Sequence, residues 1–197
     1  PMAYYYDGKD WRLLEGATDQ YSISNAIQPF AGNKDFKIWV PSDFDGKFLG
    51  NITMRRALEL SRNLASIYLV TRIGPTQVVD VAHKAGIKRN LEAVPSIGLG
   101  TSLVNPLEIV SAFSTFGNGG IHVEPFGVLK VVDNQGKTLQ EYIPEEQETF
   151  TPQSCYMLVN MMKGVVQGAR GTGSYARRLK RPIAGKTGTS QDSKDMW

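Results

Sequence analysis

Apolar residues recur at helical spacing only after residue 53, and glycine or proline separates these segments from one another. In an α-helix, side chains three and four positions apart lie on one face, so this spacing predicts short amphipathic helices. The predicted helices begin at residues 53, 75, 105, 152 and 174. The residues before them show no long helical period and contain the turn-forming pairs Asp7-Gly8, Gly32-Asn33 and Asp45-Gly46. We therefore predict an irregular, strand-rich lead-in over residues 1–52 and a mainly helical part over residues 53–180.

Two short β-prone runs interrupt the helical part, at residues 126–132 and 137–143. The residues between them, Asp133-Asn134-Gln135-Gly136, favour a turn, so the two runs predict a β-hairpin near residues 126–143. Residues 181–190 combine β-prone and small side chains and predict one further strand. The chain is therefore expected to have an α+β fold.

The composition argues against several classes of protein. With 197 residues, of which 41% are hydrophobic and 21% charged, the chain can bury one substantial core and is not predicted to be disordered. The longest largely apolar run, Leu64 to Val70, is far shorter than the roughly 20 residues that cross a bilayer. The first residues lack the charged and apolar regions of a signal peptide. A net charge of +3 is too weak to predict nucleic-acid binding.

Metal and disulfide chemistry are not expected either. The single cysteine, Cys155, cannot form an internal disulfide, and only His83 and His122 could join it as nitrogen ligands. We expect both histidines at the surface or in loops, and Cys155 as an inert thiol in the core. An apolar stripe on the same helix is also expected in the core and consists of Tyr156, Val159 and Met162. No cofactor is predicted.

Two glycine-containing runs look like nucleotide-binding motifs but lack the required context. Gly185-Lys186-Thr187 ends like a P-loop, which needs another glycine five residues earlier, where this chain has Lys180. Pro182 also removes a backbone donor that a phosphate would need. Residues 171–176 match the loose G-x-G-x-x-A pattern, yet they follow a predicted helix, whereas the dinucleotide fingerprint follows a strand. We interpret residues 171–176 as a flexible turn between helices.

The segment Lys186-Thr187-Gly188-Thr189-Ser190 has the groups that a small carboxylate needs. On a strand edge, an ammonium and hydroxyls donate hydrogen bonds, and Gly188 lets a substrate backbone approach closely. Exposed backbone N–H groups can also stabilise an oxyanion. Ser190 either extends this row of hydroxyls or simply ends the strand.

A partner for this segment is available at Ser61-Arg62-Asn63. Side chains at positions i and i+2 of a helix point about 200° apart, so Ser61 and Asn63 can serve one cleft only if a turn breaks the helix there. The helical pattern permits such a break. Taken singly, Ser61 can equally be a small packing residue, Lys186 a solvated lysine, and Arg62 a surface or salt-bridging residue.

In this order, Ser61-Arg62-Asn63 and Lys186-Thr187-Gly188 resemble the second and third signatures of serine penicillin-interacting acyltransferases. Their surroundings resemble class A penicillin-binding proteins, over 40–197 well and over 1–39 loosely. Three runs carry the resemblance: residues 53–63 as T-x-R-x-A-L-x-x-S-x-N, 99–120 as L-G…P-L-E…F-A-N-G-G, and 171–197 as G-T-G…A-G-K-T-G-T-[TS]…D-x-W. The resemblance implies a truncated penicillin-binding-protein/β-lactamase-like transpeptidase fold, with a mostly helical subdomain, a hairpin and the K-T-G strand.

The resemblance also implies a reaction, the cross-linking of peptidoglycan stem peptides through a serine acyl-enzyme. In this family the serine of an S-x-x-K motif attacks the penultimate D-alanine carbonyl, and β-lactams imitate the D-alanyl-D-alanine terminus. By resemblance, Ser61 relays a proton toward the leaving amine, and Asn63 hydrogen-bonds the acyl-side peptide. Lys186 binds the terminal carboxylate together with Thr187 and Thr189, and the backbone N–H of Thr189 completes the oxyanion hole.

The acylation motif itself is missing from the sequence, because none of its twelve lysines has serine or threonine three positions earlier. We therefore expect an internal fragment of a transpeptidase domain that is inactive alone. The resemblance implies a parent protein that is membrane-anchored, fused to a glycosyltransferase domain and placed on the extracytoplasmic face of the bacterial inner membrane. Two alternatives remain open, a non-catalytic binding or scaffold module that keeps the carboxylate site, and a plain α+β domain with chance motifs.

Overall fold

The computed structural model describes residues 2–16, 20–26, 28, 34–190 and 196. Its α-helices are α1 (Gln20–Ala26), α2 (Met54–Glu59), α3 (Asn63–Ile73), α4 (Pro75–Ala85), α5 (Pro106–Gly117) and α6 (Pro152–Gln167). Short 3₁₀ helices are η2 (Pro95–Leu99) and η3 (Ser174–Leu179). Its strands are β1 (Tyr4–Tyr6), β2 (Trp11–Leu13), β3 (Lys37–Trp39), β4 (Ile121–Val123), β5 (Lys130–Val132), β6 (Thr138–Glu141) and β7 (Glu146–Glu148). The mixed helix and strand content confirms the α+β prediction.

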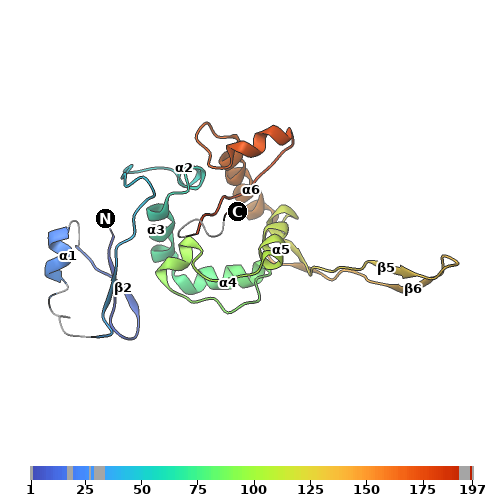
Figure 1. Cartoon of the computed structure of the whole chain (residues 1–197), viewed down its shortest axis with the longest axis horizontal. Helices are drawn as coiled ribbons and strands as arrows, with labels where there is room; N and C mark the ends of the chain where they lie inside the picture. Colours follow the sequence, from blue (N-terminus) through green and yellow to red (C-terminus); the bar gives the residue numbers. More distant parts are fainter. Residues whose placement is uncertain (1, 17–19, 27, 29–33, 191–195, 197) are drawn as a thin grey trace.

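The elements form three regions along the long axis of the molecule (Figure 1). The small sheet that contains β2 lies at one end together with α1, and helices α2 to α6 occupy the middle. The β5–β6 hairpin projects from the helices at the opposite end. The described residues thus place the predicted site motifs within the helical middle of the chain.

The lead-in forms an antiparallel sheet in the order β2-β1-β3. The predicted turn at Asp7-Gly8 joins β1 to β2, and Gly8 has a φ of +97° that favours glycine. A second predicted turn is present at Asp45-Gly46, where the Gly46 N–H donates to the Asp43 carbonyl at 2.9 Å. The pair Gly32-Asn33 lies outside the described residues. Helix α1 was not predicted, because seven residues hold only about two turns and show little of the helical period.

Helices α2, α5 and α6 each begin at a residue whose side chain caps the first turn. The Thr53 hydroxyl accepts a hydrogen bond from the Arg56 N–H at the start of α2. The Asn105 side chain accepts from the Glu108 N–H at 2.9 Å, and the Glu108 carboxylate accepts from the Asn105 N–H at 3.1 Å. This reciprocal pair is a capping box for α5. At α6, the Thr151 hydroxyl accepts a hydrogen bond from the Ser154 N–H at 3.3 Å.

Helix α6 packs against α2 and buries one of its faces. Its buried side chains are Cys155, Met162, Val165 and Val166. Cys155 is 2% exposed, which confirms the prediction of a core thiol. Tyr156 is 68% exposed, so the predicted stripe of Tyr156, Val159 and Met162 is wrong at its first residue. The reason is geometric, since one position along a helix turns the side chain by about 100° away from the face of Cys155.

The hairpin and the K-T-G segment differ from their predicted extents. The strands of the hairpin, β5 and β6, are shorter than the runs at 126–132 and 137–143, although the Tyr142 N–H still donates to the Leu129 carbonyl beside them. Within the described residues, the predicted strand over 181–190 is reduced to one antiparallel bridge, between Thr189 and Met196. A strand exists only where its backbone groups find a partner, so β-prone side chains alone do not form one.

His122 contradicts the expectation of a surface or loop histidine. It lies on β4, which pairs with β7, and its side chain is 12% exposed. Its Nδ1 is 3.0 Å from the hydroxyl of the buried Thr115. A side chain on Gly86, at the end of α4, would overlap the His122 ring, so the glycine allows the ring to pack there. His83, by contrast, is exposed as predicted.

No helix in the described part of the chain is both long and apolar enough to cross a bilayer.

The free energy of unfolding is expected to fall as the pH drops below about 4.5, the ordinary range of carboxyl pKa values. Four carboxyl groups have pKa values that are lowered from their ordinary values, those of Asp7, Asp45, Glu108 and Glu124. Hydrogen bonds are the main cause, from backbone N–H groups in the first three and from the Lys88 ammonium in Glu124. The folded chain therefore binds fewer protons than the unfolded chain in this window, and their stabilisation is lost on acidification.

Urea unfolding midpoints between pH 7 and pH 3 measure this effect. Glu108→Gln serves as the comparison, because it removes one of the four titrating groups and should reduce the slope below pH 4.5. Stability that stays constant or rises across this range contradicts the prediction.

Candidate active site

Ser61 lies in the turn between α2 and α3, as the motif requires. Its φ is +52°, a left-handed conformation that is unusual for a residue other than glycine. The Ser61 N–H donates to the Leu58 carbonyl at 3.1 Å, and the Arg62 N–H donates to the Ala57 carbonyl at 2.9 Å. These bonds close α2 and form the break that a common cleft for Ser61 and Asn63 would require. Such a backbone conformation costs about 1–3 kcal/mol and persists only where the surroundings hold it.

Contacts of the adjacent Arg62 help to hold Ser61 in this backbone conformation. Its guanidinium lies 3.0 Å from the Asp43 carboxylate and 2.9 Å from the Asp45 carboxylate, and it also donates to the Lys47 carbonyl. The side chains of Arg62 and Asp43 are 8% and 5% exposed, so this ion pair is buried. The prediction of a salt-bridging Arg62 is confirmed, whereas a surface position is wrong. The segment from Asp43 to Lys47 wraps the guanidinium, an arrangement that sequence spacing does not reveal.

Asn63 is the first residue of α3, and its amide nitrogen donates to the Ser42 carbonyl at 3.0 Å. The adjacent Leu64 N–H donates to the Asp43 carboxylate at 3.3 Å. Together with Arg62, these contacts fix the start of α3 against the lead-in. The amide nitrogen of Asn63 therefore binds the backbone of the lead-in in this arrangement.

Lys186 meets Ser61 across 125 residues of chain. Its Nζ donates to the Ser61 hydroxyl at 2.6 Å and to the Thr187 carbonyl at 2.7 Å. The lysine is half-buried, and burial lowers its pKa from the ordinary value of 10.5. Neutral oxygens accept its hydrogen bonds, so its positive charge remains available to an anionic ligand.

The hydroxyl of Thr187 lies 2.6 Å from the hydroxyl of Thr172. Thr172 belongs to the run Gly171-Thr172-Gly173, and its backbone N–H donates to the Glu59 carbonyl at 3.2 Å. Gly171 is buried, and a side chain on it would overlap the Val165 carbonyl. The run is therefore packed between α2 and α6, which contradicts its interpretation as a flexible turn. Sequence reasoning missed Thr172 as a site residue, although the G-T-G pattern of the resemblance marks its position.

The remaining predicted site residues lie at the surface. Gly188, Thr189 and Ser190 are all exposed, and Thr189 forms the bridge to Met196. The structure thus brings together Ser61, Lys186 and Thr187 and adds Thr172. This group offers an ammonium and three hydroxyls: Lys186 contacts the Ser61 hydroxyl and the Thr187 carbonyl, and the Thr187 and Thr172 hydroxyls contact each other. Such a set can bind a carboxylate and can hold one hydroxyl ready for proton transfer.

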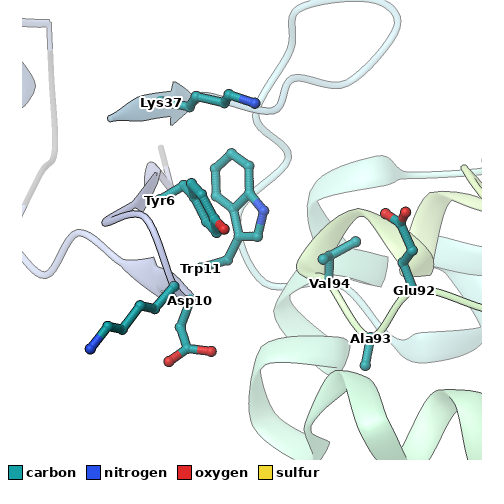
Figure 2. A pocket seen from close by; sticks show the side chains of 8 residues that line it. Tyr6, Asp10, Trp11, Lys37, Glu92, Ala93 and Val94 are labelled. Atoms are coloured by element: carbon teal, nitrogen blue, oxygen red, sulfur yellow. The ribbon is translucent and has the colours of Figure 1, made fainter. Parts of the chain in front are cut away.

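A separate cavity of about 340 Å³ lies between the N-terminal sheet and residues 92–94 (Figure 2). On the sheet side, the rings of Tyr6 and Trp11 lie 5.6 Å apart, while Glu92, Ala93 and Val94 form the opposite wall. None of the predicted site residues lines this cavity. Among the described residues, no group of three or more His, Cys, Asp or Glu side chains could hold a metal ion.

The chain matches the family described as the penicillin binding protein transpeptidase domain over residues 15–196. This chain belongs to the penicillin-binding protein transpeptidase family. Curated relatives include "Penicillin-binding protein 1A" of Aquifex aeolicus, 36% identical over 185 residues, and of Clostridium acetobutylicum, 37% identical over 204 residues. These alignments cover 94% and 100% of this chain but 25% of each relative. The chain therefore spans about a quarter of the length of these penicillin-binding proteins.

Solved structures of penicillin-binding proteins share this fold. Penicillin-binding protein 1A from Haemophilus influenzae superposes with a TM-score of 0.76 at 25% identity, over 82% of this chain and 30% of that protein. The D,D-transpeptidase domain of a peptidoglycan glycosyltransferase from Eggerthella lenta gives a TM-score of 0.66 at 21% identity, over 79% of this chain and 46% of that one. The predicted transpeptidase fold and the class A resemblance are thereby confirmed.

Proposed function

We propose that this chain supplies the carboxylate-binding and proton-relay part of a peptidoglycan D,D-transpeptidase site. The observation that carries the proposal is the 2.6 Å contact between Lys186 Nζ and the Ser61 hydroxyl. This contact joins the two family motifs, which lie 125 residues apart, at a half-buried ammonium. The family membership supports the same reaction.

The proposed reaction is an acyl transfer in two steps. A serine hydroxyl of an S-x-x-K motif, contributed from outside these 197 residues, attacks the penultimate D-alanine carbonyl as its lysine accepts the proton. The bond to the terminal D-alanine nitrogen then breaks, and that nitrogen needs a proton. The Ser61 oxygen accepts a hydrogen bond from Lys186, so its own hydrogen is directed toward another acceptor. Ser61 is therefore placed to relay the proton that the S-x-x-K lysine accepted to the leaving amine, which restores the Ser61 hydroxyl. An amine of a second stem peptide then resolves the acyl-enzyme.

The ligand end of the site is proposed to hold the terminal carboxylate of D-alanyl-D-alanine. Lys186 provides the positive charge, and Thr187 and Thr189 provide hydroxyl donors. The backbone N–H of Thr189 would complete the oxyanion hole with that of the nucleophile. Gly188 and Ser190 border this row, and Asn63 is proposed to contact the acyl-side peptide. β-Lactams would occupy the same place.

The wider setting follows from the relatives and belongs to the proposal. We infer a parent protein of the bacterial cell envelope that is anchored in the inner membrane and carries a glycosyltransferase domain. The alternative is a non-catalytic module that binds D-alanyl-D-alanine without acylation. The absence of an S-x-x-K motif from these 197 residues is compatible with both.

Binding of N-acetyl-D-alanyl-D-alanine to the chain tests the proposal, with the C-terminal amide of the same dipeptide as the control ligand. The carboxylate is expected to bind about tenfold more tightly than the amide, because a hydrogen bond to a charged group contributes about 1.5–3 kcal/mol. Equal affinities for the two ligands would overturn the proposal. A fluorescent penicillin should leave the chain without covalent label, and labelling would show that the chain contains its own nucleophile.

A further inference from the structure

We infer that Thr172 is a positioning residue that fixes the direction of the Thr187 hydroxyl and thereby makes the site selective for a carboxylate. The inference rests on the proposed function. It starts from the 2.6 Å contact between the Thr172 and Thr187 hydroxyls, which lie on segments 15 residues apart. No family signature considered above assigns a role to Thr172.

The direction of this hydrogen bond decides what Thr187 can bind. Each hydroxyl carries one hydrogen, so in a hydroxyl pair one oxygen donates and the other accepts. An ionised carboxylate accepts hydrogen bonds only. For Thr187 to donate to a carboxylate, its oxygen must accept from Thr172. Thr172 therefore holds the Thr187 hydrogen toward the ligand, and donation from Thr172 also polarises the Thr187 hydroxyl.

Thr172 can do this because its backbone is anchored to the end of α2, directly before the turn that holds Ser61. Its N–H donates to the Glu59 carbonyl, two residues before Ser61. The Glu59 side chain lies in a notch of α6, where a side chain on Gly164 would overlap its carboxylate. Arg56 forms an ion pair with Glu59 at 3.3 Å. The positions of the Thr172 and Ser61 hydroxyls are therefore linked through one end of α2.

A carboxylate needs the Thr187 hydroxyl to donate a hydrogen bond, whereas an amide ligand does not. The C-terminal amide offers both donors and an acceptor, so it can bind a Thr187 hydroxyl in either orientation. Loss of the Thr172 hydroxyl should therefore weaken carboxylate binding and leave amide binding nearly unchanged. The measurable quantity is the ratio of the two dissociation constants.

NMR titration of the 197-residue chain with N-acetyl-D-alanyl-D-alanine and its C-terminal amide measures this ratio. Thr172→Val keeps the shape and removes the hydroxyl, and it should lower the preference for the carboxylate about three- to tenfold. Thr172→Ser restores the hydroxyl and should stay within about twofold of the unmodified chain. Thr138→Val is the matched control, an exposed threonine of β6 outside the site, and should change nothing.

A double-mutant cycle with Thr187→Val separates positioning from a general structural effect. In the Thr187→Val background, Thr172→Val should no longer alter the preference, because the hydroxyl that it orients is gone. An effect of Thr172→Val that persists there, or its absence in the unmodified background, overturns the inference while the proposed function stands. If the unmodified chain does not distinguish the two ligands, the proposed function fails and the inference fails with it. If Thr172→Val does not fold, Thr172→Ala provides the same comparison.

Discussion

Replacing Arg62 with methionine is expected to lower the free energy of unfolding by about 3–5 kcal/mol, the usual cost of removing one partner from a buried ion pair. The guanidinium of Arg62 and the carboxylate of Asp43 are almost completely buried, and Asp45 and the Lys47 carbonyl complete the set of acceptors. Methionine fills a similar volume but leaves the Asp43 charge without its cation. For a chain of this length, the loss corresponds to a melting temperature lower by about 6–20 °C.

Thermal and urea unfolding of the Arg62→Met chain measure this loss. Arg89→Met is the matched control, because Arg89 also faces a carboxylate, that of Glu108 at 3.8 Å, but its side chain is 59% exposed. The control should change the free energy of unfolding by less than about 0.5 kcal/mol. Adding Asp43→Asn to Arg62→Met should recover part of the loss, since it removes the unpaired charge. A loss below about 1 kcal/mol for Arg62→Met shows that the pair does not hold the turn.

Replacing Lys186 with methionine is expected to weaken ligand binding strongly without destabilising the fold. The carboxylate of N-acetyl-D-alanyl-D-alanine should bind about 10- to 100-fold more weakly, because a charge-assisted hydrogen bond is lost. Burial disfavours the ammonium, as its lowered pKa indicates, and neutral oxygens accept its hydrogen bonds. The free energy of unfolding should therefore stay constant or rise by up to about 1 kcal/mol. Such a gain is common when a group that is kept for binding, and is unfavourable for folding, is replaced.

Titration and urea unfolding of the same Lys186→Met sample provide the two readouts. Lys84→Met is the control, because Lys84 is an exposed lysine in the last turn of α4, an element that carries none of the site residues. It should leave the dissociation constant within about twofold. Unchanged carboxylate binding in Lys186→Met refutes its role as the anion anchor. A loss of more than about 1 kcal/mol in stability means that the lysine is part of the scaffold instead.

Local signals in the sequence predicted the helical elements well. Thr53, Asn105 and Thr151 cap helices because their side-chain oxygens reach backbone N–H groups only three residues away. The helical pattern permitted a break at Ser61, which a common cleft for two motif residues would need, and the turn is present. Tyr156 and His122 were misplaced, because exposure depends on which face another element covers.

The candidate site was predicted in part. Ser61, Lys186 and Thr187 were expected to meet, and the structure brings them into contact. Their catalytic and binding roles stay predictions, as do those of Asn63 and Thr189. Thr172 was overlooked because its hydroxyl contacts Thr187 only after the G-T-G run packs on α2.

By itself, the sequence determined the identity and order of the motifs, the caps and the breaks of the helices, since each depends on side chains within about one turn of each other. It also determined that the reacting serine of the family is not among these 197 residues. Only the tertiary structure decided that Arg62 is buried between two carboxylates and that Lys186 reaches Ser61. These contacts join residues that are 17 to 125 positions apart, as in the pairs Arg62–Asp45 and Lys186–Ser61. Contacts over such distances depend on how whole elements pack, and no local pattern of residues encodes that packing.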